Sequence, residues 1–376
     1  MTRRTGLRAG LRAGLRGGLT VRAVLTVRTG LTVFAITVIP SLLGGCSAQG
    51  STVAPAGPAA ELRLGYFDNV THAPALVGLE KGILANSLGD TKLRSQVFSA
   101  GPATIEALSA GAIDAAYLGP NPAVNSFIKS AGKSVRIVAG AASGGAALVV
   151  RAGIDSPADL AGTTIATPQL GNTQDVALRA WLGEQGYDTD TAGGGRVHIA
   201  PTDNAQTLAL FQSGKIDGAW LPEPWVSRLV LDAGATVLVD EASLWPEGAF
   251  PTTVLLVRSE YLTEHPETVQ ALVAGHTASV GWLNAHPDEA ATVINEKLTE
   301  DTGKGLSKAV ITRALSRVTF TTDPLAATFP MLLKAGVTVG TAKSGTLAGL
   351  FDLAPLNTVL ATAGGTPVSA AGLGTE

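Results

Sequence analysis

From residue 62 onward, short apolar stretches alternate with longer segments whose apolar residues recur every three to four positions. Residues 62–67 (LRLGYF) alternate apolar with polar or small side chains, which predicts a strand, and the next apolar positions suit a helix over 74–81. The same order recurs, with strands expected at 93–98, 115–118, 135–139 and 146–151 and helices at 102–110 and 122–131. Alternating strands and helices are typical of parallel sheets covered by helices.

A second block repeats this plan and then gives way to helices. Strands are expected at 164–166, 197–200, 218–221 and 236–239, and helices at 172–184, 204–212 and 223–233. The stretch TTVLLVR near 252–258 echoes AALVVR at 146–151, so we expect two crossings between two lobes, with a hinge near both stretches. Helices at 266–285, 287–298, 306–315 and 326–334 would then return to the first lobe.

The predicted fold is therefore α/β and bilobal, with parallel-rich sheets flanked by helices and a ligand cleft between the lobes. We expect the first lobe to comprise 61–148 and the returning helical part 253–360, and the second lobe to comprise 149–252. Residues 361–376 are rich in Gly, Ala and Thr and are expected to form a disordered tail.

One sequence pattern occurs twice in the chain. SAGAIDAAYLGPNP (109–122) and QSGKIDGAWLPEPW (212–225) share a Gly, an Ile-Asp pair, an aromatic residue, a Leu and a Pro-X-Pro. Each copy places a strand end and a helix start at the sheet edge where ligands of open α/β sheets bind. We expect two equivalent loops that face each other across the cleft and present Asn121 and Glu223.

The first 45 residues have the pattern of an export signal. They contain seven arginines and no acidic residue, and 29–43 is uncharged and apolar. Leu43-Gly44-Gly45-Cys46 resembles a bacterial lipobox, which predicts a signal peptide over 1–45, a lipid on Cys46 and a flexible linker over 46–60. An ordinary secretory signal is the alternative. Arg3-Arg4 leaves both the general and the twin-arginine export routes open.

Charge and cysteine content exclude several classes of partner. Without residues 1–45, 20 basic side chains face 30 acidic ones, a net charge of −10, which argues against nucleic acid and against an anionic membrane surface as partners. Cys46 is the single cysteine, and no two histidines stand at the helical i, i+4 spacing. No metal or cofactor is expected.

Neutral polar residues gather where the predicted strands end and helices begin. These loops are rich in Ser, Thr, Asn, Gln and Gly and poor in Lys and Arg, so hydroxyls, amides and helix N-termini would bind a small desolvated anion. The phosphate-binding motifs G-x-x-x-x-G-K-[ST] and, after a strand, G-x-G-x-x-G are both absent from the sequence. The candidate ligand-binding residues are Asn69, Thr71, His72, Gly119, Pro120, Asn121, Ser143, Asn172, Thr173, Gln174, Glu223 and Trp225.

Several of these residues also have a purely structural interpretation. Thr71 and Asn172 suit helix caps as well as they suit ligand contacts. His72 is expected to pack or hydrogen-bond locally, because no matching nucleophile is visible. Trp225 is either core or a wall of the cleft that covers an organic tail, with Tyr117 or Phe67 as helpers. A carboxylate is a poor neighbour for an anion, so for Glu223 a structural role ranks ahead of contact with the ligand.

Four stretches carry a resemblance to a known family. LRLGYFDNVTHAPALVGLEKGIL, AGPATIEALSAGAIDAAYLGPNPAVNSF, TPQLGNTQDVALRAWL and FQSGKIDGAWLPEPW are similar to substrate-binding lipoproteins of ABC importers for sulfonates, taurine and nitrate, above all the aliphatic-sulfonate branch. The likeness runs from about residue 62 to about 356 and implies the type II periplasmic-binding-protein fold. It also implies a monomer, held to the extracytoplasmic face of the membrane by its lipid, that delivers a small anion to a permease and its ATPase.

The resemblance leaves the ligand open. An aliphatic sulfonate is the leading candidate, and nitrate or bicarbonate, taurine and a thiamine-pyrimidine precursor are the alternatives. An enzyme on the same scaffold is the rival from another class, but the sequence shows no Cys–His pair, no Ser–His–Asp order and no metal-ligand set. A sensor domain would need a fused signalling segment, and none is visible.

Overall fold

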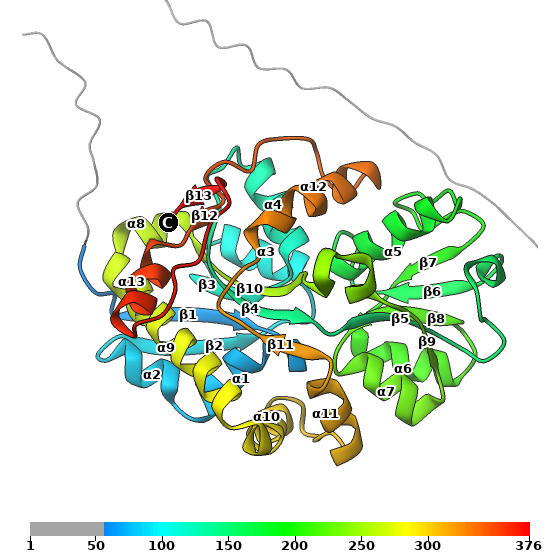
Figure 1. Ribbon diagram of the computed structural model, residues 1–376, viewed down its shortest axis with the longest axis horizontal. Helices are drawn as coiled ribbons and strands as arrows, with labels where there is room; N and C mark the ends of the chain where they lie inside the picture. The colour runs from blue at the N-terminus through cyan, green and yellow to red at the C-terminus, as the bar shows by residue number, and fades with distance from the viewer. Residues whose placement is uncertain (1–55) are drawn as a thin grey trace, which may run out of the picture. The chain divides into compact units, whose positions relative to one another are not determined.

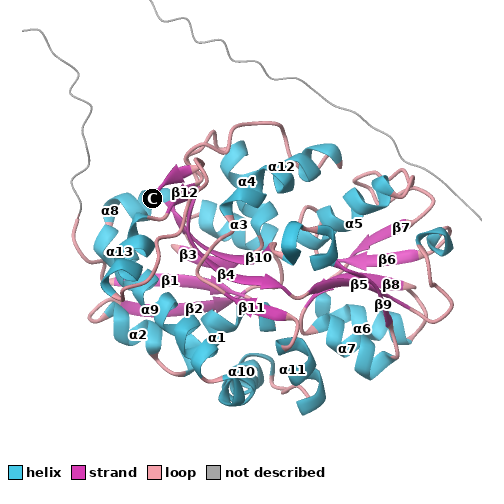
Figure 2. Ribbon diagram, viewed as in Figure 1, coloured by secondary structure: helices cyan, strands magenta, loops and turns pink. Residues whose placement is uncertain are grey.

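The computed structural model describes residues 56–376, which contain two β-sheets with helices on both faces of each (Figures 1 and 2). The larger sheet has the order β13-β12-β4-β10-β3-β1-β2, with β11 paired to β4. Its strands are β1 (Glu61–Tyr66), β2 (Lys92–Val97), β3 (Ala115–Leu118), β4 (Val135–Gly144), β10 (Pro251–Arg258), β11 (Val318–Phe320), β12 (Phe351–Asp352) and β13 (Gly374–Thr375). This sheet and its helices are called the first lobe below.

The second lobe is built on a smaller sheet of order β7-β6-β8-β5-β9. Its strands are β5 (Ala146–Val150), β6 (Thr164–Thr167), β7 (His198–Pro201), β8 (Gly218–Pro222) and β9 (Thr236–Asp240). Strand β6 runs parallel to β7 and β8, whereas β5 runs antiparallel to β8 and β9. Both sheets are therefore mixed, and the predicted α/β architecture of two sheets flanked by helices is confirmed.

The crossings between the lobes lie slightly outside the expected boundaries. Strand β5 belongs wholly to the second sheet and β10 wholly to the first, so the chain changes lobe at Gly145 and again between β9 and β10. Gly144 and Gly145 have φ of +76° and +73°, a left-handed conformation that glycine adopts without steric cost. A tight turn at these two residues ends one sheet and starts the other.

Helices cover both faces of each sheet. In the first lobe, α3 and α4 lie on the face opposite α1 and α2, and α9 packs on α1 and α2 (Figure 1). In the second lobe, α5 lies opposite α6 and α7 (Figure 1). The helices are α1 (Ala73–Glu80), α2 (Ile83–Leu88), α3 (Gly101–Ser109), α4 (Pro120–Lys129), α5 (Thr173–Glu184), α6 (Asn204–Gln212), α7 (Trp225–Ala233), α8 (Ser259–Glu264), α9 (Pro266–Ala285), α10 (Pro287–Thr302), α11 (Lys308–Leu315), α12 (Phe329–Thr338) and α13 (Ala354–Thr362).

Short 3-10 helices occupy several of the connections between these elements. They are η1 (Val70–His72), η2 (Pro157–Leu160), η3 (Glu241–Leu244), η4 (Pro246–Gly248) and η5 (Ala326–Thr328). The first of them, η1, continues directly into α1 after β1 ends. It therefore carries Thr71 and His72 to the carboxyl edge of the first sheet.

Alternation along the strands supplies the cores. In β8, Trp220 joins an apolar cluster on one face of the second sheet and Leu221 joins a separate cluster on the other face. Strand β5 divides in the same way between Leu148 and Val149. The first lobe has one continuous core that runs from Leu62 on β1 to helices of the C-terminal part.

The aspartates of the repeated sequence pattern, Asp114 and Asp217, occupy equivalent positions in the two lobes. Asp114 precedes β3 and its carboxylate accepts the backbone N–H of Arg63 at 3.0 Å. Asp217 precedes β8 and accepts the backbone N–H of Thr164 at 2.8 Å. The backbone carbonyl of Asp114 also accepts the N–H of Arg258, the last residue of β10, at 2.8 Å, and that of Asp217 accepts the N–H of Arg151, directly after β5, at 2.9 Å.

The two Pro-X-Pro segments, in contrast, are not equivalent. Pro120 and Asn121 lie in the first turn of α4. In the second copy Pro222 ends β8, Glu223 lies in the following turn, and α7 begins at Trp225. The expectation of two matching loops is therefore wrong beyond the shared leucine, because the second Pro-X-Pro stands one residue closer to its strand than the first.

The C-terminal segment is ordered, so the predicted disordered tail over 361–376 is wrong. Strand β13 pairs with β12 at the edge of the first sheet. Asn357 holds the backbone of Val368 on both sides, accepting its N–H at 2.8 Å and donating to its carbonyl at 3.0 Å. Ala370 is fully buried. These contacts provide hydrogen bonds for the backbone of the segment. Its small side chains bury little surface, which is why its sequence alone suggests disorder.

Residues 1–55 lie outside the described part of the chain, and with them the predicted signal peptide, the lipid on Cys46 and most of the linker. Within 56–376, no helix is both long and apolar enough to span a membrane.

Candidate functional site

A small cavity lies where the two lobes meet. It measures about 20 Å³, room for roughly one water molecule. Loops at strand ends of both sheets and the starts of α5 and α6 surround it. Its lining residues are Phe67, Asn69, Thr71, His72, Ser99, Gly119, Asn172, Gln174, Asn204, Pro222, Thr252 and Thr253.

The N-termini of three helices lie at this region. Helices α4, α5 and α6 have Gly119, Asn172 and Asp203 at their N-cap positions, and none of these residues caps its helix through a side chain. The first N–H groups of a helix lack intrahelical partners and carry a partial positive charge. Gly119, Asn172 and Asn204, the first residue of α6, line the cavity, so all three helix ends lie at it.

Buried polar atoms beside the cavity lack partners. Thr173 Oγ1, Asn204 Oδ1 and Thr253 Oγ1 make no hydrogen bond within the described part of the chain, although the three residues are only 2%, 8% and 1% exposed. Buried polar groups are normally hydrogen-bonded, so unpaired ones call for water or a ligand. Their arrangement suits a molecule that both accepts and donates hydrogen bonds.

The lining is electrically neutral. His72 is its one titratable residue, and burial lowers the pKa of its imidazole to about 3. The ring stacks on Phe67 with 4.4 Å between centroids, and its Nδ1 accepts the N–H of Phe67 at 3.3 Å. The imidazole is thus uncharged near neutral pH, and any anion would be held by dipoles and hydrogen bonds rather than by a cation.

The structure brings together half of the predicted ligand-binding residues. Those on the cavity wall are Asn69, Thr71, His72, Gly119, Asn172 and Gln174, with Thr173 beside them. Thr71 lies inside η1, whose N-cap position is Asn69, so it is not a helix cap. Asn172 is the N-cap residue of α5 but makes no side-chain cap, so its amide is not committed to capping.

Other predicted residues face elsewhere. Asn121 turns toward α12, where its Nδ2 donates to Leu332 O at 3.2 Å. Pro120 precedes it in the first turn of α4, and neither residue lines the cavity. Ser143 lies on β4 opposite Thr319 of β11 and likewise does not line the cavity.

Ser99, Asn204, Thr252 and Thr253 were missed by the sequence prediction. Asn204 opens α6 in a loop of the same polar type as the others, which was a usable signal. Thr252 and Thr253 follow Pro251 in the first residues of β10 and have the pattern of the polar end of an apolar strand. Only the position of β10 in the first sheet brings them to the cavity.

Glu223 and Trp225 lie off the cavity wall and connect the lobes. The Glu223 carboxylate accepts the backbone N–H of Ser227 at 3.0 Å and pairs with Arg313 of α11 at 3.1 Å. Desolvation raises the pKa of Glu223, opposed by Ser227 and by Arg313. Trp225 Nε1 donates to Asn69 Oδ1 at 2.7 Å, from the second lobe to the first.

Gly119 of the first lobe lies close against Thr173 of the second lobe. A Cβ added to Gly119 would lie 2.3 Å from Thr173 Oγ1, the first residue of α5. A larger residue fits only if the Thr173 side chain or the second lobe shifts. The absence of a side chain at Gly119 therefore permits the contact that encloses the cavity.

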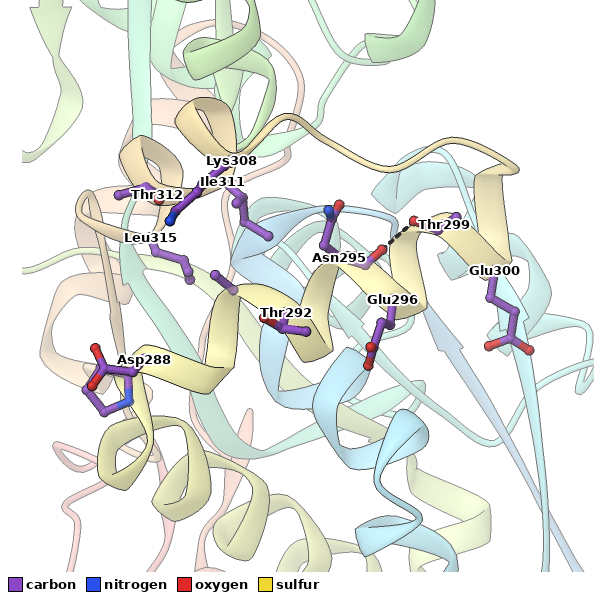
Figure 3. A pocket seen from close by; sticks show the side chains of 12 residues that line it. Asp288, Thr292, Asn295, Glu296, Thr299, Glu300, Lys308, Ile311, Thr312 and Leu315 are labelled. Carbon is purple, nitrogen blue, oxygen red and sulfur yellow. Dashed lines mark hydrogen bonds between the residues drawn. The ribbon is translucent and has the colours of Figure 1, made fainter.

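A larger hollow, of about 930 Å³, lies on the surface between α10 and α11. Figure 3 shows the side chains of Asp288, Glu296 and Glu300 projecting from α10 along it. These three carboxylates are exposed. They would repel an anion, so this groove does not share the chemistry of the interlobe cavity.

No cluster of three or more His, Cys, Asp or Glu side chains within 56–376 is arranged to hold a metal ion.

Comparison with known proteins places these features in a wider group. The family described as NMT1-like matches residues 55–296. The taurine-binding periplasmic protein of Escherichia coli K12 is 29% identical over 215 residues, 57% of this chain and 64% of that protein. A putative aliphatic sulfonates-binding protein of Bacillus subtilis 168 is 25% identical over 290 residues, 76% of this chain and 80% of that protein.

The fold is shared with solved binding proteins. The alkanesulfonate-binding protein of Xanthomonas axonopodis pv. citri, solved with bound MOPS, superposes with a TM-score of 0.62 at 23% identity. The match covers 76% of this chain and 95% of that protein. At this identity the likeness establishes a common fold.

Proposed function

This chain belongs to the NMT1-like family, and from that premise we propose that it is an extracytoplasmic solute-binding protein. It captures an aliphatic sulfonate between its lobes and delivers it to the permease and ATPase of an ABC importer. The single observation that carries the proposal is the uncharged cavity between the lobes, with helix N-termini and unpaired hydroxyls around it. The printed names of the taurine- and sulfonate-binding relatives support the choice of ligand.

The chemistry of a sulfonate suits this cavity. The group is a permanent anion with three acceptor oxygens, so hydroxyl, amide and helix N–H donors can hold it without a cation. Thr71, Thr253 and the N-terminus of α5 are the donors that the geometry offers. Phe67 is the apolar surface available to an organic tail, since neither Tyr117 nor Trp225 lines the cavity. Contact of Trp225 with a longer tail stays a prediction.

We expect sulfonates to raise the thermal unfolding midpoint, because a ligand that binds the folded form stabilises it by mass action. A panel of alkanesulfonates, taurine, nitrate, bicarbonate and a pyrimidine precursor, followed by calorimetry on each hit, tests this. Binding of nitrate or the pyrimidine without binding of any sulfonate would overturn the choice of ligand and leave the fold untouched.

A variant with its matched control connects the binding to the cavity. Thr253→Val removes an unpaired buried hydroxyl and should weaken every sulfonate by about 1–3 kcal/mol, the scale for a hydrogen bond to a charged group. Thr292→Val makes the same change in the groove between α10 and α11 and should leave the affinity unaltered. Equal effects of the two variants would place the ligand outside the cavity.

Ligand entry requires the lobes to separate. A space for one water is too small for a sulfonate, so we propose that the lobes open and close about the two crossings, at Gly144–Gly145 and at 241–250. Small-angle scattering of the protein should give a smaller radius of gyration when a binding sulfonate is added at saturation. An unchanged radius with a ligand shown to bind would argue against hinge motion.

A lipid on Cys46 would hold the protein at the membrane. The proposal rests on Leu43-Gly44-Gly45-Cys46 after an apolar stretch. In cells, Cys46→Ser should release the protein from the membrane fraction or leave the precursor uncleaved, and labelled fatty acid should no longer be incorporated. Unchanged processing and fractionation of the variant would show that the cysteine is not the anchor.

A further inference from the structure

The loop that follows β1 carries an acidic residue among residues that line the cavity. Its lining residues are Phe67, Asn69, Thr71 and His72, and Asp68 stands between the first two. Asp68 Oδ1 is buried and has no hydrogen-bond partner within residues 56–376. Consecutive Cα atoms are about 3.8 Å apart, so the Asp68 carboxyl stands within roughly 10 Å of an anion in the cavity. Any charge on this carboxyl therefore acts on that anion.

The Asp68 carboxyl belongs to a cluster with more acidic than basic groups. It hydrogen-bonds Asp301 of α10. Asp301 accepts Tyr66 Oη and Lys297 Nζ, both at 2.8 Å. Lys297 Nζ also donates to Glu300 at 2.8 Å, so one ammonium group serves three carboxyls and already pairs with two of them. A hydrogen bond between two carboxyls requires a proton on one of them, because an ionised carboxylate only accepts.

Other ionisable groups around this loop leave the Asp68 carboxyl without a cation of its own. His72 on η1 is uncharged near neutral pH. On and just after α11, which packs against η1, Arg313 pairs with Glu223 at 3.1 Å and Arg317 with Asp240 at 3.9 Å. The remaining charged residues of the elements that contact η1 stand at the far ends of those elements; they are Glu80 of α1, Arg136 of β4, Arg258 of β10 and Lys308 of α11.

This environment favours the protonated form of Asp68. Desolvation, followed by the charge of Asp301, raises the pKa of Asp68 to about 7, and Lys297 opposes the shift only in part. An anion in the cavity would repel the Asp68 carboxylate as Asp301 does, so the protonated form should bind the anion more tightly. By linkage, binding of the anion takes up a proton, and the affinity falls as pH rises through the pKa of Asp68.

We propose that Asp68 couples capture of the anion to uptake of a proton from the solvent: the anion binds the protein whose Asp68 is protonated, and its binding holds that proton in place. The inference rests on the proposed function, since it assumes that a permanent anion such as a sulfonate occupies this cavity. Neither a sulfonate nor His72 titrates near neutral pH. Asp68 then sets the pH dependence of binding.

Calorimetry of the protein with ethanesulfonate tests the proposal. Titrations at pH 7.5 in two buffers of different ionisation enthalpy measure the protons taken up, and we expect about half a proton. The affinity should be about tenfold lower at pH 9 than at pH 5.5, the scale of a charge–charge repulsion at this separation. Measurable binding without proton uptake would overturn the proposal and leave the proposed function standing. Failure of ethanesulfonate to bind at both pH values would overturn the proposed function, and the inference with it.

A variant and its matched control assign the proton to Asp68. Asp68→Asn removes the ionisable group at nearly unchanged volume, so its affinity at both pH values should equal that of the wild type at pH 5.5, without proton uptake. Burial raises the pKa of Glu241 to about 7 as well, but Glu241 bonds Trp220 in the second lobe and does not line the cavity. Glu241→Gln should therefore keep the wild-type uptake. Uptake that persists in Asp68→Asn would overturn the proposal.

Asp301→Asn gives an independent readout that leaves the cavity loop unaltered. It removes the charge that raises the pKa of Asp68 and frees Lys297, which lowers it. The midpoint of the affinity against pH should therefore move to lower pH. A purely structural role of the cluster would change the affinity equally at every pH, and an unmoved midpoint would contradict the proposal even if Asp68→Asn failed to fold.

Discussion

The stretches 109–122 and 212–225 share a sequence frame, but only the first part of the frame has the same structure in both lobes. Asp114 and Asp217 stand before central strands and accept the backbone N–H of the neighbouring strand. After the shared leucine the copies diverge. Gly119 touches Thr173 across the cavity, whereas Glu223 pairs with Arg313 and connects the lobes on another side.

This difference separates scaffold from site. An aspartate at the base of a strand satisfies backbone donors of any α/β unit, so both lobes need it for the same reason. The carboxyl end of each strand faces the other lobe, and the two lobes present different residues to each other. The residues that are repeated in the sequence are therefore those that each lobe needs to fold. The residues after the shared leucine are those that differ between the two sides of the cleft.

The largest expected effect contrasts the two aspartates. The Asp114 side chain is 2% exposed and pairs with Arg63 and Arg258, whereas Asp217 is 32% exposed and pairs with Arg151. Asp114→Ala should lower the free energy of unfolding by about 3 kcal/mol, because it strands a buried network. Asp217→Ala should lower it by about 1 kcal/mol.

Urea unfolding of both variants measures this contrast. Asp232→Ala serves as a control, since Asp232 is exposed and its pair with Arg228 is 3.9 Å long, so its loss should be barely measurable. Equal losses at Asp114 and Asp217 would mean that burial does not distinguish the two copies.

The aromatic residues of the two copies, Tyr117 and Trp220, have titratable partners whose contributions to the free energy of unfolding should change with pH in opposite directions. Tyr117 Oη lies 2.9 Å from His276 Nδ1, and burial lowers the pKa of His276 to about 4. Trp220 Nε1 donates to Glu241 at 2.7 Å, and burial raises the pKa of Glu241 to about 7. Between about pH 4 and about pH 7 the first lobe thus holds a neutral imidazole and the second a protonated carboxyl.

The sign of each effect follows from which state binds the proton. Between pH 6.5 and about 4 the unfolded chain protonates His276 and the folded chain does not, so the stability due to His276 falls as pH falls. Between pH 4.5 and about 7 the folded chain keeps the proton of Glu241 and the unfolded chain loses it, so that stability falls as pH rises. Each effect is on the order of 3 kcal/mol.

Urea unfolding from pH 4 to pH 8 checks both slopes. His276→Gln should flatten the acid side of the stability curve and Glu241→Gln the neutral side, each relative to the wild type. His72 adds to the acid side in every variant, so the difference curves carry the test. Two difference curves of the same sign would contradict the assignment.

The residue after the shared leucine gives an intermediate effect. Gly119→Ala would drive a methyl group into Thr173, so we expect a loss of about 1–3 kcal/mol in the closed, ligand-bound form. Gly183→Ala on α5 meets open space and should stabilise the protein by up to about 1 kcal/mol. Calorimetry with a sulfonate measures the affinity of Gly119→Ala, and urea unfolding measures the free energy of unfolding of Gly183→Ala. Unchanged affinity in Gly119→Ala would show that the lobes do not need this contact.

The smallest expected effect concerns Trp225. Trp225→Phe removes the hydrogen bond to Asn69 and keeps an aromatic ring beneath Arg228, so ligand affinity should fall by about 1 kcal/mol. Combining it with Asn69→Ala in a double-mutant cycle isolates the pair. Strict additivity of the two substitutions would mean that the bond does not help to hold the lobes together.

Local pattern was enough to predict most of the elements. The predicted strand at 115–118 and the predicted helix at 266–285 have the observed bounds of β3 and α9, because apolar period and flanking Pro or Gly are local properties. The polar loop residues Thr71 and Gln174 were found for a similar reason, since strand ends in α/β folds lie at one edge. The C-terminal segment was misjudged because its order depends on Asn357 and β12 rather than on its own composition.

By itself the sequence determined the α/β plan, the two lobes and the neutral chemistry of the loops, because these depend on residues close together in the chain. Only the tertiary structure decided which polar side chains meet in the cavity and which hold the lobes together. Glu223 and Arg313 are 90 positions apart, and Trp225 and Asn69 are 156 apart. Such partners follow from how one lobe packs against the other, and no local period or composition encodes that packing.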